Sequence, residues 1–141
     1  MENLQQARKI IESTQYVFAA VGNGHRLLSS AKGISRLLEY IQAGESLENM
    51  SVADSVVGKA AALMMVKLKV YEVYAKVISK PALSVFEKHK IPVSCGEVAE
   101  FIVNRKGDGM CPMEASVLEI DDADEAYGVL VRKVEEMRGK K

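Results

Sequence analysis

Apolar residues in the first third of the chain recur at spacings that predict a helix, a hairpin and a second helix. Over residues 3–12 they are three and four positions apart, which is typical of a short amphipathic helix. Residues 16–21 form an apolar run that predicts a strand, and residues 25–29 are expected to return antiparallel to it. Between them, Gly22-Asn23-Gly24 supplies residues that tolerate the positive φ of a tight turn. Helical spacing resumes over residues 34–41.

The longest apolar stretch runs from the residue after Lys59 to Val66 and predicts a helix that is enclosed by protein on almost every side. We expect residues 52–66 to form the most buried helix of the fold. Polar side chains gather near its start, among them Asp54 and Lys59. Because the N-terminus of a helix attracts anions, this start is a natural place for a ligand site in an α/β protein.

The second half of the chain predicts strands that alternate with helices. β-Branched and aromatic residues over 70–79 predict a strand, and Ser79 is expected to cap a helix whose first turn holds Pro81. Pro92 would weaken strand pairing, so residues 91–94 are expected to form a short edge strand. The remaining expected elements are a helix over 97–103, a loop over 104–109, a helix over 112–120 and a last helix that begins near Asp122.

This order of elements predicts an α/β fold, specifically a three-layer α/β/α sandwich around a mixed sheet of four or five strands. The hairpin would supply antiparallel pairing, and the following helix–strand–helix–strand units would supply parallel pairing. With 141 residues, the chain is expected to form one domain over residues 1–141.

Charge and cysteine content exclude several classes of function. Nineteen basic and nineteen acidic residues cancel, so no overall field would draw the protein to nucleic acid or to a membrane surface. No apolar run approaches the roughly 20 residues of a membrane span, and Cys95 and Cys111 are too few for a disulfide scaffold. The first residues lack the pattern of a signal peptide. We therefore expect a soluble cytoplasmic protein, with association into a homo-oligomer left open.

The order hairpin, helix, strand, proline-containing turn, helix and strand resembles the cytidine deaminase fold. In that superfamily, His-x-Glu and Pro-Cys-x-x-Cys motifs open two helices and hold a zinc ion. The corresponding segments here, residues 53–59 and 79–83, contain no zinc ligand of that kind. The chain is more similar to a small prokaryotic family of unknown function that keeps this fold without zinc, which implies neither a metal nor another cofactor. The resemblance covers nearly the whole chain and is most specific over residues 54–62, 74–83 and 104–115.

Three candidate site residues lie around the start of the expected buried helix. Asp54 either completes a capping box with Ser51 or binds a ligand, and the two roles are compatible. Glycine inside a helix costs about 1 kcal/mol relative to alanine, so we expect a close neighbour at Gly58, either a strand or a ligand. Lys59 stands alone among apolar residues and therefore calls for an anion, which is either a bound phosphate or carboxylate or a salt-bridged carboxylate at the edge of the core.

The other candidates are Ser79, Lys80, Asn104, Arg105 and Cys111. Ser79 and Lys80 end an expected strand, where α/β folds bind ligands, although a helix cap and a solvated lysine explain them as well. Asn104 and Arg105 belong to a glycine-containing loop that could offer amides and a guanidinium to an anion. Cys111 precedes a helix that begins with proline; it is either a reactive thiol at a helix start or a packed side chain.

Two functions are compatible with these residues. In the first, the protein binds a nucleotide or another phosphorylated small molecule at helix N-termini, with Lys59 or Lys80 on the phosphate. The alternative is a non-zinc enzyme that acts on a nucleotide-like substrate through Asp54 or Cys111. We favour binding because neither histidine is placed in the sequence to activate a nucleophile. In both cases we expect one concave site, lined by Asp54, Gly58, Ser79, Lys80 and the loop from Asn104 to Cys111.

Overall fold

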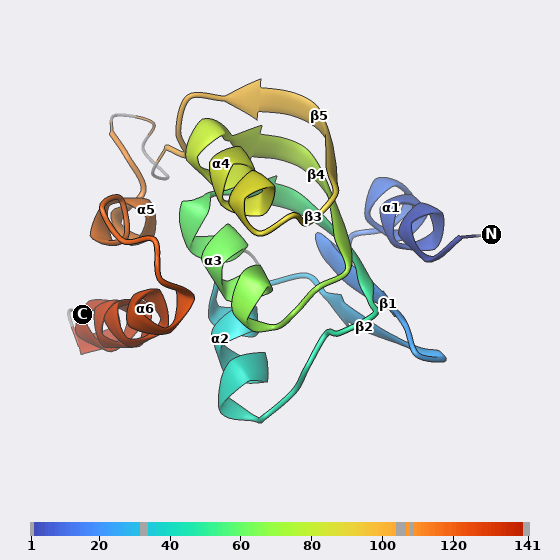
Figure 1. Ribbon diagram of the computed structural model, residues 1–141, viewed down its shortest axis with the longest axis horizontal. Helices are drawn as coiled ribbons and strands as arrows, with labels where there is room; N and C mark the ends of the chain where they lie inside the picture. The colour runs from blue at the N-terminus through green and yellow to red at the C-terminus, as the bar shows by residue number, and fades with distance from the viewer. Residues whose placement is uncertain (1, 32–33, 104–106, 108, 140–141) are drawn as a thin grey trace.

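The chain folds into alternating helices and strands, as the computed structural model in Figure 1 shows. It describes residues 2–31, 34–103, 107 and 109–139. Asn104 and Arg105, two of the predicted site residues, lie outside these ranges. The elements in chain order are α1 (Asn3–Ser13), β1 (Phe18–Gly22), β2 (His25–Ser29), α2 (Ser35–Gln42), β3 (Ser51–Val57), α3 (Lys59–Lys67), β4 (Glu72–Ser79), α4 (Lys80–Lys88), β5 (Val93–Ala99), α5 (Pro112–Ser116) and α6 (Ala123–Gly139).

The described strands form a five-stranded mixed sheet with the order β2-β1-β3-β4-β5. β1 pairs antiparallel with both β2 and β3, whereas β3, β4 and β5 run parallel to one another. The register places Asp54 of β3 between Phe18 of β1 and Ala75 of β4. The predicted α/β class and the mixed sheet of four or five strands are therefore confirmed.

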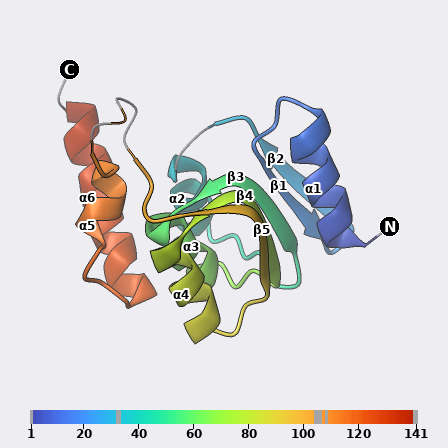
Figure 2. The same ribbon diagram turned by 90° about the horizontal axis from the view of Figure 1, so that it is seen from above.

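Helices cover the two faces of the sheet unequally (Figure 2). α1 packs on one face, where Ala7 and Ile11 share a small cluster with Ala19 of β1. The larger core lies on the opposite face, beneath α2, α3 and α4, and includes Phe18 and Ala20 of β1. Neighbouring residues of a strand point to opposite faces, so β1 contributes to both clusters. α6 packs against α3, and α5 contacts both α6 and α3 (Figure 1).

Several local predictions are confirmed. The hairpin turns through Asn23 and Gly24, both in the left-handed region with φ of 53° and 79°. Ser79 caps α4 by accepting a hydrogen bond at 3.2 Å from the Ala82 N–H to its Oγ. Asp122 caps α6 in the same manner, because its Oδ2 accepts the Glu125 N–H at 2.7 Å. β5 is an edge strand, as Pro92 suggested.

The prediction of one buried helix over residues 52–66 is wrong in its first half. Ser51–Val57 is strand β3, which pairs with β1 and β4, and the helix begins only at Lys59. The polar residues of this strand, Ser51, Asp54 and Ser55, resemble the capped start of a helix, and its apolar residues continue into α3, so the sequence did not separate the two elements. Ser51 does not cap a helix; its hydroxyl donates to the Glu72 carboxylate at 2.6 Å. The helical half is as buried as expected, since its first seven residues are all buried.

Two elements of the second half also differ from the prediction. Residues 97–103 were expected to be helical, but β5 continues through Ala99 in parallel pairing with β4. Val98 and Phe101, two apolar residues of this stretch, are exposed and form no buried helix face. The helix expected over 112–120 ends at Ser116. Within the described residues, no helix has the length and hydropathy needed to cross a membrane.

Candidate functional site

Two helices begin at the same edge of the sheet. β3 ends at Val57 and β4 ends at Ser79, and α3 and α4 follow at once, at Lys59 and Lys80. Because β3 and β4 are parallel, with Val57 paired to Ile78, both helix starts lie at their common carboxyl edge. This is the edge at which open α/β sheets bind ligands.

The N-terminus of α3 is already bound by a carboxylate from the chain itself. Oε1 of Glu114, in α5, accepts the Lys59 N–H at 2.5 Å, and Oε2 accepts the Ala60 N–H at 2.9 Å. The Glu114 side chain is buried, and burial raises its pKa, although the amides of Ala60 and Lys59 and the nearby ammonium counteract this effect. Glu114 therefore supplies the anion that a helix N-terminus favours.

The same carboxylate explains Gly58, which is the N-cap of α3 and not an internal helix residue. Its φ of −101° is ordinary for any residue. A Cβ at this position would lie within 2.6 Å of three atoms of the Glu114 carboxyl group. The close neighbour expected at Gly58 is thus neither a strand nor a bound molecule but the side chain of Glu114.

The ammonium group of Lys59 points to a different set of partners. Its Nζ donates to the Leu118 carbonyl at 2.8 Å and forms an ion pair with Asp121 Oδ1 at 3.1 Å. The Lys59 side chain is 8% exposed, whereas that of Asp121 is 70% exposed. The hydrogen bond and charge of Lys59 hold the pKa of Asp121 below its ordinary value, and Lys88 adds a smaller attraction. The sequence left open whether the anion at Lys59 is a bound ligand or a carboxylate of the protein, and the structure contains the carboxylate of Asp121.

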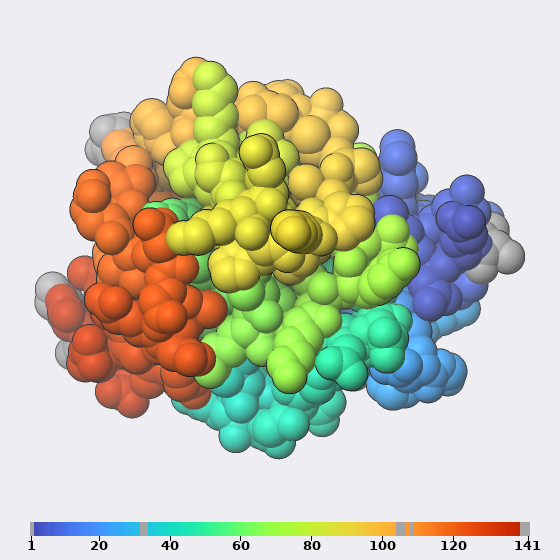
Figure 3. Space-filling model, viewed as in Figure 1, coloured from blue at the N-terminus to red at the C-terminus, as the bar shows by residue number. Residues whose placement is uncertain are grey.

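A cavity of about 270 Å³ lies beside this ion pair, between α4 and the residues that lead into α6. In the space-filling view, α4 and the segment before α6 lie next to each other on one face of the molecule (Figure 3). Pro81 and Val85 supply apolar surface, while the polar lining residues are Lys59, Ser84, Lys88, His89 and Asp121. The cavity lining contains two lysines and a histidine but one aspartate. Its net charge is therefore positive even when the aspartate is ionised.

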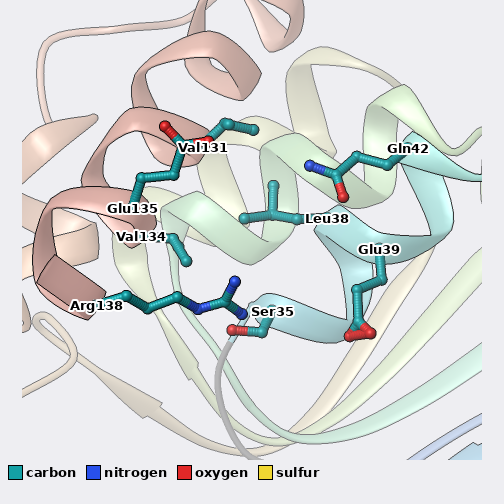
Figure 4. A pocket seen from close by; sticks show the side chains of 8 residues that line it. All are labelled: Ser35, Leu38, Glu39, Gln42, Val131, Val134, Glu135 and Arg138. Atoms are coloured by element: carbon teal, nitrogen blue, oxygen red, sulfur yellow. The ribbon is translucent and has the colours of Figure 1, made fainter.

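A second, smaller cavity of about 80 Å³ lies between α2 and α6 (Figure 4). Leu38, Val131 and Val134 line it together with polar side chains that include Glu135 and Arg138. None of the residues predicted to form a site lines this cavity. Its volume is small and its lining mixes apolar and charged side chains of both signs, so it does not indicate a particular class of ligand.

Asp54 lies away from the edge where the helices begin. It sits in β3 four residues before Gly58, which corresponds to about 13 Å along a strand. Burial raises its pKa to about 7, although the amides of Ser55 and Val56 act in the opposite direction. Asp54 lines neither of the two cavities described above.

The remaining predicted residues have other partners. Ser79 is buried and caps its own helix. The Lys80 side chain is 62% exposed, and its Nζ pairs with Glu100 at 2.8 Å. Cys111 is half-buried at the start of the short helix α5, and its N–H donates to the Ile102 carbonyl at 2.9 Å. The structure thus brings Gly58, Lys59, Ser79 and Lys80 to one edge of the sheet, and only Lys59 of this group lines the larger cavity.

Four residues of this region were not singled out as site residues in the sequence: Lys88, His89, Glu114 and Asp121. Lys88 and His89 look like an ordinary basic helix end, and Glu114 looks like an acidic residue in the first turn of its own helix. In the sequence, Lys59 indicated only that an anion was needed nearby, and Gly58 indicated only a close neighbour of unspecified kind. Within the described ranges, no group of three or more His, Cys, Asp and Glu side chains is arranged to hold a metal ion.

Comparison with known proteins shows which family the chain is similar to. The family model described as a domain of unknown function, DUF1893 (TM1506), matches residues 6–134. A crystal structure of a DUF1893 family protein, TM1506 from Thermotoga maritima, is similar to the chain with 35% sequence identity and a TM-score of 0.85. The similarity covers 94% of this chain and 91% of that protein. No curated protein matches the chain. The chain therefore belongs to the DUF1893 family.

Proposed function

We propose that the protein binds a nucleotide or another phosphorylated small molecule in the cavity beside Lys59. The observation that carries this proposal is the cavity of about 270 Å³ along α4, with Lys59, Lys88 and His89 in its lining. Its volume is close to the lower end of the range for small-molecule sites. A compact phosphorylated molecule is the kind of ligand that fits both the volume and the charge.

The burial of Lys59 makes it the anchor of the proposed site. Charge–charge attraction is stronger in a partly buried site than in bulk water, and the Lys59 side chain is 8% exposed. Lys88 and His89 follow each other at the end of α4 and are exposed, so they can meet an anion that enters from solvent. The ligand would then contact one buried and one exposed lysine.

This proposal places the phosphate at lysine side chains and not at helix N-termini. The first amides of α3 bind Glu114, and the Ala82 amide of α4 binds Ser79. In this proposal Ser79 and Lys80 do not contact the ligand, because neither lines the cavity. A contribution of Asn104 and Arg105 to binding stays a hypothesis. The alternative of a non-zinc enzyme also stays a hypothesis, because neither Asp54 nor Cys111 lines the cavity.

We further propose that the fold is a three-layer, cytidine deaminase-like sandwich that lacks the zinc site. The element order supports this proposal, since a hairpin is followed by helix, strand, helix and strand. α1 lies on one face of the sheet and α2, α3 and α4 on the other. The segments that would carry zinc ligands in the resembled fold, Ala53–Lys59 and Ser79–Leu83, contain neither histidine nor cysteine.

Calorimetric titration with AMP and ribose 5-phosphate tests the proposed function, with adenosine and ribose as unphosphorylated controls. We expect the phosphorylated compounds to bind and their controls not to bind. Lys88→Ala should weaken binding, because it removes one of the two lysines of the cavity. Lys80→Ala is the matched control: Lys80 lies on the same helix but pairs with Glu100 outside the cavity. Equal weakening by both variants, or equal binding of adenosine and AMP, would contradict the proposed site.

A further inference from the structure

Lys59 holds the segment before α6 at three points. Its N–H binds Glu114, and its Nζ binds both the Leu118 carbonyl and the Asp121 carboxylate. The Glu114 side chain is buried and its two oxygens each accept a backbone N–H, and the Leu118 carbonyl belongs to the backbone, so both contacts are costly to break. Asp121 differs from both, because its side chain is 70% exposed and hydration can replace its contact with Lys59.

Asp121 also occupies the position that an incoming anion would take. Its Oδ1 is 3.1 Å from Lys59 Nζ, within the lining of the cavity that contains Lys88. An anion that approaches Lys59 must therefore either displace the Asp121 carboxylate or bear its repulsion.

We propose that Asp121 is an internal competitor at this site, and that the phosphoryl group of the ligand replaces its carboxylate at Lys59 Nζ. This inference rests on the proposed function. With Asp121 in place, the two lysines of the cavity face one negative charge from the protein. After Asp121 leaves, they face the ligand with two positive charges, which match a phosphate monoester that carries close to two negative charges at neutral pH. The exchange thus favours phosphate monoesters over ligands that carry one carboxylate.

The remaining contacts of the segment are expected to persist when the ligand binds. Glu114 stays on the α3 N-terminus and Leu118 stays on Lys59, because both contacts lie inside the protein. Binding would then move the Asp121 side chain without unfolding α5.

The test is the affinity of Asp121→Asn for AMP and ribose 5-phosphate, measured by calorimetry at low ionic strength. We expect roughly three- to tenfold tighter binding than in the wild-type protein, because the neutral amide competes poorly for the ammonium. Asp124→Asn is the matched control. Asp124 is 79% exposed and also pairs with a lysine, Lys67, but it does not line the cavity. The Asp124→Asn substitution removes the same charge from the protein and should leave the affinity for both phosphorylated compounds nearly unchanged.

The possible results separate the inference from the proposed function. Tighter binding by Asp121→Asn than by Asp124→Asn supports the role of Asp121. If the wild-type protein binds a phosphorylated probe and Asp121→Asn binds it no more tightly than Asp124→Asn, the inference is overturned while the proposed function stands. If neither probe binds to the wild-type protein or to Asp121→Asn, the proposed function fails, and the inference fails with it.

Discussion

Gly58→Ala should destabilise the protein through Glu114, not through backbone strain. The φ and ψ of Gly58, −101° and −177°, are accessible to alanine. The added methyl group would overlap the Glu114 carboxyl group, which stands at the end of a flexible side chain. The overlap is therefore relieved when Glu114 moves, and the energetic penalty is the loss of its hydrogen bonds to the Lys59 and Ala60 amides.

The size of this effect follows from those two bonds. Hydrogen bonds to charged groups contribute about 1.5–3 kcal/mol each. The displaced carboxylate regains part of its hydration, so we expect a loss of about 3 kcal/mol in the free energy of unfolding. For a chain of this length, that corresponds to a fall in Tm of roughly 10 °C. Urea unfolding followed by far-UV circular dichroism measures the free energy, and calorimetry measures the Tm.

Two further variants isolate the mechanism. Gly128→Ala is the control, because among the described residues a Cβ there would meet just the Arg132 guanidinium, at 3.7 Å. Gly128 lies inside α6, so alanine should stabilise the protein by about 1 kcal/mol. In a Glu114→Ala background the clash at residue 58 disappears, and Gly58→Ala should then have almost no effect. Additive losses in the double variant, or a Gly58→Ala protein as stable as wild type, would refute the role assigned to Glu114.

Two other predictions concern Asp54 and metal content. The pKa of Asp54 is raised from 3.8 to about 7 in the folded protein, so the folded state binds the proton more tightly than the unfolded state. Stability should fall as the pH rises from about 4 to about 7. Asp54 keeps part of its surface exposed, so the effect of its charge on stability is reduced by solvent. Asp54→Asn should therefore raise the free energy of unfolding by about 2 kcal/mol at pH 8 and by much less at pH 4. A gain in stability that does not depend on pH would contradict a role for the Asp54 charge. Elemental analysis of protein purified without chelator should find zinc well below one equivalent, and a stoichiometric zinc ion would contradict the zinc-free fold proposed above.

Features set by neighbouring residues could be predicted from the sequence. The turn at Asn23-Gly24 and the caps at Ser79 and Asp122 depend on side chains and backbone within three residues of each other. The boundary between β3 and α3 could not be predicted, because Ser51, Asp54 and Ser55 resemble the polar start of a helix and the valines after them run on into the apolar residues of α3. Periodicity does not distinguish a buried strand from a buried helix in such a run.

The site was predictable only in part, because its residues come from segments that are distant in the sequence. The need of Lys59 for an anion follows from its apolar surroundings in the sequence. The close neighbour at Gly58 was expected from the cost of glycine inside a helix, and it is present although Gly58 is the N-cap of α3. The identity of both partners does not follow from the local sequence, because Glu114 and Asp121 come from a distant segment. A single helix would bring Asp54 and Gly58 to one face, but strand β3 separates them.

The position of a bound phosphate tests the central claim most directly. A crystal structure of the protein with ribose 5-phosphate or AMP should show the phosphoryl group within hydrogen-bond distance of Lys59 Nζ, with Lys88 beside it and Asp121 turned away. Phosphate bound elsewhere, for example beside Lys80 at the start of α4, would contradict the proposed cavity. Phosphate beside Lys59 with the Asp121 ion pair intact would support the site and contradict the exchange.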